Sequence, residues 1–172
     1  EDRKIVSRGL KPPLKMLKKK PYFMTINTGQ QWARLLLSLA SGSLAIVVPL
    51  VDLNASHLLH PDWSMHARFH VLWAVLVFSM MGWYSLYLLW LSPWTIMTRI
   101  RIVMVMMLII NSAFLATTAL RSFYGGALAD EHGGVPSLPN GWDPNLTVVI
   151  ATLLLLSLTG WLSKERKNGS AF

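Results

Sequence analysis

The stretch VLWAVLVFSMMGWYSLYLLWL, residues 71–91, contains no charged side chain. An α-helix rises 1.5 Å per residue, so about 20 apolar residues match the ~30 Å hydrocarbon core of a bilayer. Comparable uncharged stretches occur at residues 35–51, 102–120 and 146–162. The alternating pattern of a membrane β-barrel is absent. The sequence therefore predicts an all-α integral membrane protein, built as a four-helix bundle.

The composition agrees with a membrane protein. Of the 172 residues, 53% are hydrophobic and only 14% are charged, whereas soluble domains are about 25% charged. We expect a basic N-terminal arm over residues 1–31, a four-span domain over residues 32–163 and a short tail over residues 164–172. The chain has no cysteine, which excludes thiolate metal sites, iron–sulfur ligation and disulfides.

Apart from Arg68 and Arg121, which flank spans on the other side, the basic residues fall on one side of the predicted spans. They occupy the N-terminal arm, the short connection after residue 91 and the tail, whereas loops 53–66 and 122–144 carry no lysine or arginine. Short loops rich in these residues stay in the cytoplasm. We therefore expect both termini to be cytoplasmic, in the inner (plasma) membrane of a bacterium.

The net charge of +8 is concentrated before the first span. A basic segment beside a span attracts anionic lipid headgroups, and we expect this of Lys18, Lys19 and Lys20. Because the charge is not spread over a face of a folded domain, membrane lipids are the expected partner and nucleic acid is not.

Residues 57–70 read HLLHPDWSMHARFH and hold four of the five histidines. We call them the histidine segment. It lies between the first two spans, on the predicted outer side, and ionisable groups gathered at a membrane boundary mark candidate functional sites. If the second helix begins near Asp62 to Ser64, His66 and His70 lie one turn apart on one face. That spacing suits two imidazoles on one metal ion.

A hairpin at the outer leaflet would bring a larger set of ligands together. Nitrogen and oxygen ligands without sulfur suit divalent zinc, copper or iron. Haem is not expected, because bis-histidine ligation needs facing histidines within the bilayer and only His70 is near a span. An interfacial structural role for these histidines stays open, as does the question whether the chain is an enzyme. The candidate metal ligands are Asp52, His57, His60, His66 and His70.

Other residues on the predicted outer side are candidates for contact with a substrate or partner. Loop 122–144 is longer than most connections, and its His132 would add a ligand or a base, or lie at a solvated loop tip. Arg121 can pair with an anionic group or with Asp52. The candidate contact residues are Asp62, Trp63, Arg68, Arg121 and His132.

Small residues recur at helical spacing in two spans, which predicts close helix contacts. Pro49 is expected to kink the first span. Asp143 and Pro144 are expected to start the fourth helix as N-cap and first-turn proline. The small residues are Ser38, Ser41, Gly42 and Ala45 in the first span and Ser112, Ala113, Ala116 and Thr117 in the third.

The histidine segment resembles a motif of small multipass membrane proteins of uncharacterised function. In those proteins a histidine, an Asn-Pro-x-Trp turn and a His-Ala-Arg-Phe-His helix start follow one another. His60 departs from the pattern, because it stands where the similar proteins tend to have asparagine. The resemblance implies a four-span layout and a role for the segment, but no activity. The matching residues are His57, Pro61, Trp63, His66, Ala67, Arg68, Phe69 and His70.

The function that fits these features best is an accessory or assembly subunit of a larger integral-membrane complex, with the histidines and Asp52 on its outer face. Four short spans bury little internally, so other membrane subunits or further copies of the chain are expected partners. A membrane enzyme or metal-binding protein that uses these histidines is the alternative. A small transporter is weaker, because no charge lies in the middle of a span.

Overall fold

The computed structural model describes residues 26–128 and 137–164. These residues are helical or in connecting turns, and no strand occurs among them. The predicted all-α fold is confirmed, with four helical rods long and apolar enough to cross a membrane. The elements are α1 (Thr28–Gly42), the π-helical η1 (Ser43–Val47), α2 (Val48–Asp52), α3 (Met65–Trp90), α4 (Ile96–Tyr124) and α5 (Pro144–Ser163).

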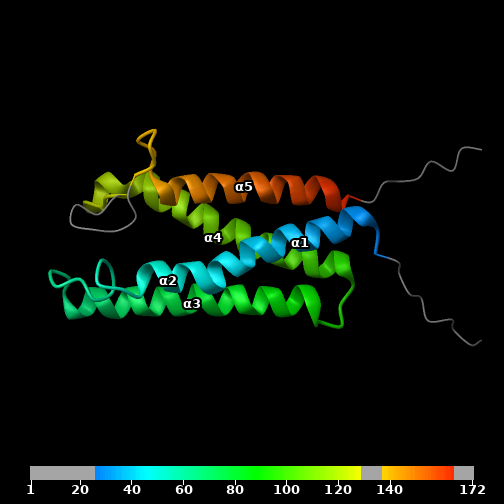
Figure 1. The fold of residues 1–172 in the computed structure, drawn as a ribbon, viewed down its shortest axis with the longest axis horizontal. Coiled ribbons are helices and arrows are strands. Elements are labelled where there is room, and N and C mark those ends of the chain that lie inside the picture. The colour runs from blue at the N-terminus through cyan, green and yellow to red at the C-terminus, as the bar shows by residue number, and fades with distance from the viewer. Residues whose placement is uncertain (1–25, 129–136, 165–172) are drawn as a thin grey trace, which may run out of the picture.

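The first rod, formed by α1, η1 and α2, runs between α3 and the pair of helices α4 and α5 (Figure 1). It packs along α3 on one flank, and α4 and α5 pack together on the other. α1 also contacts α4 and α5, whereas α3 and α5 do not meet. We call the end that carries the turn 91–95 and both described chain ends the terminal end. The opposite end, with loop 53–64 and the described residues 125–128 and 137–143, is the loop end.

At the helix starts, polar side chains accept hydrogen bonds from backbone amides that have no carbonyl partner within the helix. Ser64 accepts from the Ala67 amide at the start of α3, and Asp143 from the Leu146 amide at the start of α5. Asp143 is the N-cap residue that the sequence predicts, and Pro144 follows in the first turn as expected. α4 ends at Gly125, whose φ of 71° is left-handed and favours glycine.

The helices extend beyond the uncharged stretches. α3 begins at Met65, six residues before the predicted span, and therefore includes the second half of the histidine segment. α1 begins at Thr28 and includes Arg34. A helix satisfies its own backbone, so it continues through the headgroup region, where polar side chains are tolerated.

The first rod takes a π-helical turn at residues 43–47 because of Pro49. Proline has no amide hydrogen and its ring clashes with the carbonyl four residues earlier, here that of Ala45. The freed Ala45 carbonyl accepts a 2.9 Å hydrogen bond from the Ser79 hydroxyl of α3. Membrane helices tolerate proline where a neighbouring helix supplies such a donor.

The small residues of the first rod make the close helix contact that their spacing predicts. Ser41 and Ala45 are buried, and they face Gly82 of α3. A Cβ placed on Gly82 would lie only 2.5 Å from the Ala45 nitrogen and 2.6 Å from the Ser41 carbonyl oxygen. Backbone therefore packs directly on backbone here, which is how small residues bring membrane helices together.

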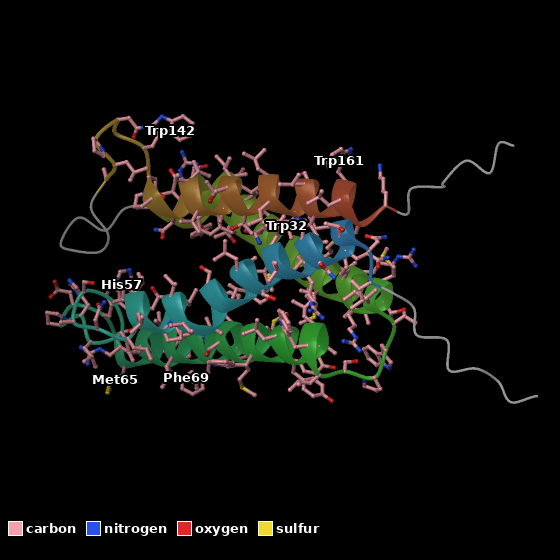
Figure 2. All side chains as sticks on the ribbon, turned by 45° about the vertical axis from the view of Figure 1, so that its right-hand side comes forward. Trp32, His57, Met65, Phe69, Trp142 and Trp161 are labelled. Atoms are coloured by element: carbon pink, nitrogen blue, oxygen red, sulfur yellow. The ribbon has the colours of Figure 1, made fainter. Side chains whose placement is uncertain are left out.

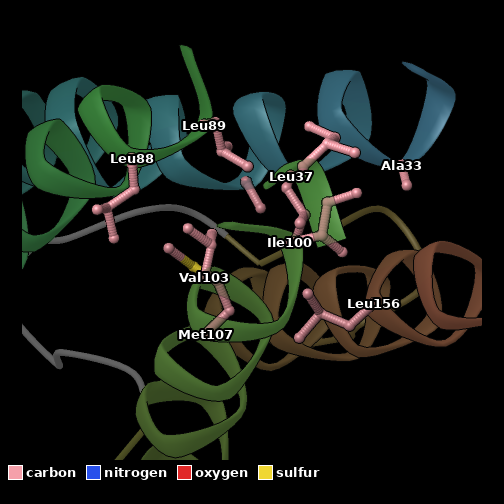
Figure 3. Packing of buried hydrophobic residues seen from close by; sticks show 10 residues of the cluster. Ala33, Leu37, Leu88, Leu89, Ile100, Val103, Met107 and Leu156 are labelled. Carbon is pink, nitrogen blue, oxygen red and sulfur yellow. The ribbon is translucent and has the colours of Figure 1, made fainter. Parts of the chain in front are cut away.

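The buried apolar core lies in the half of the bundle near the terminal end (Figure 3). It joins α1, the last turns of α3, the first half of α4 and the second half of α5. Met107 is part of it, and its flexible apolar side chain suits an irregularly shaped core. The members are Ala33, Leu37, Ala40, Leu88, Leu89, Ile96, Ile100, Val103, Met107 and Leu156.

Candidate functional site

Loop 53–64 folds back on the end of the first rod through its own polar groups. The Asn54 amide donates to the Val51 carbonyl at 2.6 Å, and its oxygen accepts from the Ser56 amide and hydroxyl at 2.9 and 2.7 Å. The Leu58 amide donates to the Asp52 carbonyl at 3.1 Å. Asparagine commonly closes turns in this way. These bonds hold the first half of the histidine segment close to Asp52.

Arg68 of α3 ties the second part of this loop to the helix. Its Nη2 donates to the His60 carbonyl at 2.8 Å and to the Pro61 carbonyl at 3.4 Å. His60 is the buried one of the four described histidines, only 7% exposed, and its Nδ1 accepts from the Asp62 amide at 3.3 Å. In this chain Arg68 and His60 therefore position the loop.

Trp63 lies against two of the candidate ligands. Its ring meets His57 edge-on at 6.2 Å between centroids and His60 at 6.3 Å. His57 shares a 2.9 Å hydrogen bond through Nδ1 with the Ser56 hydroxyl, and it interacts electrostatically with Asp52. The aromatic and polar contacts orient His57 at the loop end, where Figure 2 labels it.

His66 and His70 form a close pair in the first turns of α3. Their Nε2 atoms are 3.0 Å apart, and the ring planes are perpendicular with centroids 4.5 Å apart. Both side chains are exposed. The His70 ring also lies near Phe69 and Trp73, at 5.7 and 6.0 Å between centroids. The predicted one-turn spacing on one helix face is therefore realised.

Of the five candidate metal ligands, His66 and His70 form a close pair. His57 interacts electrostatically with Asp52, and His60 is buried in loop 53–64. Within residues 26–128 and 137–164, no three His, Asp or Glu side chains form a group that could hold one metal ion. The other candidates His132, Lys18, Lys19 and Lys20 lie outside the described residues.

Arg121 lies at the loop end of α4, beside a hollow of about 120 Å³ between α4, α5 and the turn after α4. Its Nη1 donates to the Thr118 carbonyl of its own helix at 2.8 Å. The Tyr124 hydroxyl donates to the Thr117 carbonyl at 3.0 Å. Sequence reasoning identified Arg121 but missed the hollow, because it forms only where the last turn of α4 meets the start of α5.

A second set of polar contacts lies at the terminal end, between α1 and α3, and the sequence did not predict it. The Arg34 guanidinium lies 3.8 Å above the Trp90 ring, and the Trp90 indole donates to the Ser38 hydroxyl at 2.8 Å. Tryptophan is common at membrane interfaces. The pairing of Trp90 with Arg34 joins residues from two helices, and no local pattern indicates it.

No protein-family model, curated protein or solved structure matches this chain. The site must therefore be interpreted from its own geometry.

Proposed function

We propose that this chain is an accessory or assembly subunit of a larger integral-membrane complex. The observation that carries the proposal is an exposed small-residue face on the loop half of α4. Ser112, Ala113, Ala116 and Thr117 repeat the small-xxx-small spacing of the first rod. All four are exposed in the chain by itself.

The first rod provides the comparison. Its small residues are covered by α3, with Gly82 in backbone contact. From Ser112 to Tyr124, in contrast, no residue of α4 is buried. The neighbouring half of α5 is also open, since its first buried residue is Leu156. A membrane helix of another subunit fits such a face, because small side chains let two backbones approach and gain dispersion contacts that lipid tails make less well.

We further propose that the terminal end faces the cytoplasm of a bacterial cell. Among the described residues, the terminal end carries the cationic side chains Arg34, Arg99, Arg101 and Lys164 and no acidic one. The loop end carries Asp52, Asp62 and Asp143 together with two arginines, Arg68 and Arg121. The basic arm, with Lys18, Lys19 and Lys20, would then meet anionic lipid on the inner leaflet. Because the chain has no cysteine, Asp62→Cys and Lys164→Cys can each be labelled with an impermeant maleimide. Labelling of Lys164→Cys in intact cells would overturn this orientation.

The subunit proposal is tested by the mass of the particle extracted gently from its native membrane. We expect a mass well above 19.3 kDa, with at least one other polypeptide present in fixed ratio. A homogeneous oligomer that contains only copies of this chain would overturn the proposal.

A substitution tests whether the α4 face makes the contact. Ala116→Leu fills the exposed small-residue face, and we expect it to release the other polypeptide while the chain stays folded. Ala74→Leu is the matched control, because Ala74 is exposed on α3 and outside that face. Loss of the partner in both variants, or in neither, would contradict docking at this face.

A further inference from the structure

We propose that His66 and His70 form a two-imidazole binding site for a divalent transition-metal ion, with Cu²⁺ the preferred ion. The proposal rests on the pair itself and is independent of the subunit role. It uses two of the five candidate metal ligands, His66 and His70, and gives the arrangement in which they would bind one ion. The two Nε2 atoms are 3.0 Å apart, and both side chains are exposed, so an ion can reach them from solvent.

The distance between the nitrogens fits two adjacent positions in one coordination sphere. An ion bound to both nitrogens would form two bonds of about 2.0–2.1 Å. With the nitrogens 3.0 Å apart, the N–metal–N angle would be about 90–97°. This is the angle between adjacent ligands in a square-planar or octahedral sphere, and it is smaller than the tetrahedral angle of structural zinc sites. Tetragonal nitrogen and oxygen sites are typical of Cu²⁺ and Ni²⁺. Cu²⁺ also binds such ligands most tightly among the first-row divalent ions.

The helix supplies the preorganisation that a chelate needs. Residues four apart lie on one face of α3, so binding one imidazole places the second beside the same ion. The helix start is fixed by the Ser64 hydroxyl, which accepts from the Ala67 amide at 3.2 Å. On one side the His70 ring is flanked by Phe69 and Trp73. The ligand spacing is therefore set by α3 and its N-cap Ser64, without a contribution from loop residues 53–63.

Without an ion, the same geometry is a hydrogen bond between two neutral rings, in which one Nε2–H donates and the other Nε2 accepts. When an ion binds through both Nε2 atoms, each ring carries its proton on Nδ1. Two ligands do not fill a four- or six-coordinate sphere, so water occupies the remaining positions in the isolated chain.

The test is titration of the purified full-length protein in detergent with CuSO₄, followed by electron paramagnetic resonance. We expect one equivalent of Cu²⁺ with hyperfine splitting from two equivalent imidazole nitrogens, reversed by EDTA. His66→Gln or His70→Gln should each weaken binding by at least about tenfold, because the chelate is lost. Zn²⁺ should bind more weakly than Cu²⁺.

His57→Gln is the matched control, because it removes another histidine of the loop end and leaves the pair intact. Its Cu²⁺ affinity should equal that of the unmodified protein. Unchanged Cu²⁺ affinity in the His66→Gln/His70→Gln double variant would overturn the proposal, since the ion would then bind elsewhere. A spectrum with a single coordinated imidazole would overturn the chelate as well. Circular dichroism of each variant, with unchanged helicity, excludes misfolding as the cause.

Discussion

The Ser79 hydroxyl of α3 donates a 2.9 Å hydrogen bond to the carbonyl oxygen of Ala45, in the π-helical turn of the first rod. Pro49, four residues after Ala45, has no amide with which to occupy that carbonyl. One hydroxyl on a neighbouring helix therefore compensates for a helix-breaking residue within the span. Such a bond both satisfies the carbonyl and fixes the register between the two helices.

Ser79→Ala is expected to destabilise the protein by about 1–3 kcal/mol, the usual cost of leaving a buried polar group without its partner. The free energy of unfolding in mixed detergent micelles measures this loss. Pro49→Ala restores an amide that can donate to the Ala45 carbonyl, so the same Ser79→Ala change should cost much less in that background. Equal costs in both backgrounds would contradict the compensation. Ser157→Ala is the control, because its hydroxyl bonds only the Leu153 carbonyl of its own helix.

Gly82→Ala tests the backbone contact between α3 and the first rod. The added Cβ would meet the Ala45 nitrogen and the Ser41 carbonyl oxygen, which are backbone atoms and cannot turn away. The helices would have to separate, and overpacking of this kind costs about 1–3 kcal/mol. Gly42→Ala is the control: a Cβ there meets nothing within 4 Å, so we expect a neutral effect or a gain of up to about 1 kcal/mol. Similar unfolding free energies for the two variants would refute the contact.

The parts of the fold that depend on neighbouring residues in sequence could be predicted. Uncharged length gave the four spans, and Asp143 with Pro144 marked the start of α5. The start of α3 and the one-turn spacing of His66 and His70 followed in the same way. These features need only local geometry, so no knowledge of the tertiary structure was required.

The rest depends on contacts between residues distant in sequence. The Ser79–Ala45 bond joins residues 34 positions apart, and the Trp90–Ser38 bond residues 52 apart. The arrangement of the loop-end side chains also depends on how loop 53–64 folds back, which no periodic pattern encodes. Hydropathy specifies which residues enter a bilayer, but every face of such a helix is apolar, so it does not specify which face meets a neighbour.

Substitutions at Trp90 separate the energetic contribution of its ring contact with the Arg34 guanidinium from that of its hydrogen bond to Ser38. Trp90→Phe keeps an aromatic face for the Arg34 guanidinium but removes the indole donor to Ser38, an expected loss of about 0.5–1.5 kcal/mol. Trp90→Leu also removes the cation–π contact and should cost about 0.5–1 kcal/mol more. The free energy of unfolding measures both. If the two variants are equally stable, the guanidinium contributes nothing through the ring. Trp161→Phe, at an exposed indole on α5, serves as control.

Arg68→Met tests whether the guanidinium holds loop 53–64 on α3. Methionine keeps much of the apolar stem but removes the donors to the His60 and Pro61 carbonyls. Bonds from a charged donor contribute about 1.5–3 kcal/mol, and ~1.4 kcal/mol corresponds to a tenfold change in an opening equilibrium. We therefore expect amide hydrogen exchange in the loop to accelerate at least about tenfold, while exchange in the middle of α3 stays unchanged.

The control for this prediction is Arg121→Met, because the Arg121 guanidinium bonds a carbonyl of its own helix. It should leave exchange in loop 53–64 as it is. Arg68→Met also tests whether loop 53–64 contributes to copper binding, since the spacing of His66 and His70 is set by α3. Copper affinity should therefore survive the loosening of the loop. A variant that loses copper along with loop protection would mean that residues of loop 53–64 complete the coordination sphere, and the two-imidazole site would have to be redrawn to include them.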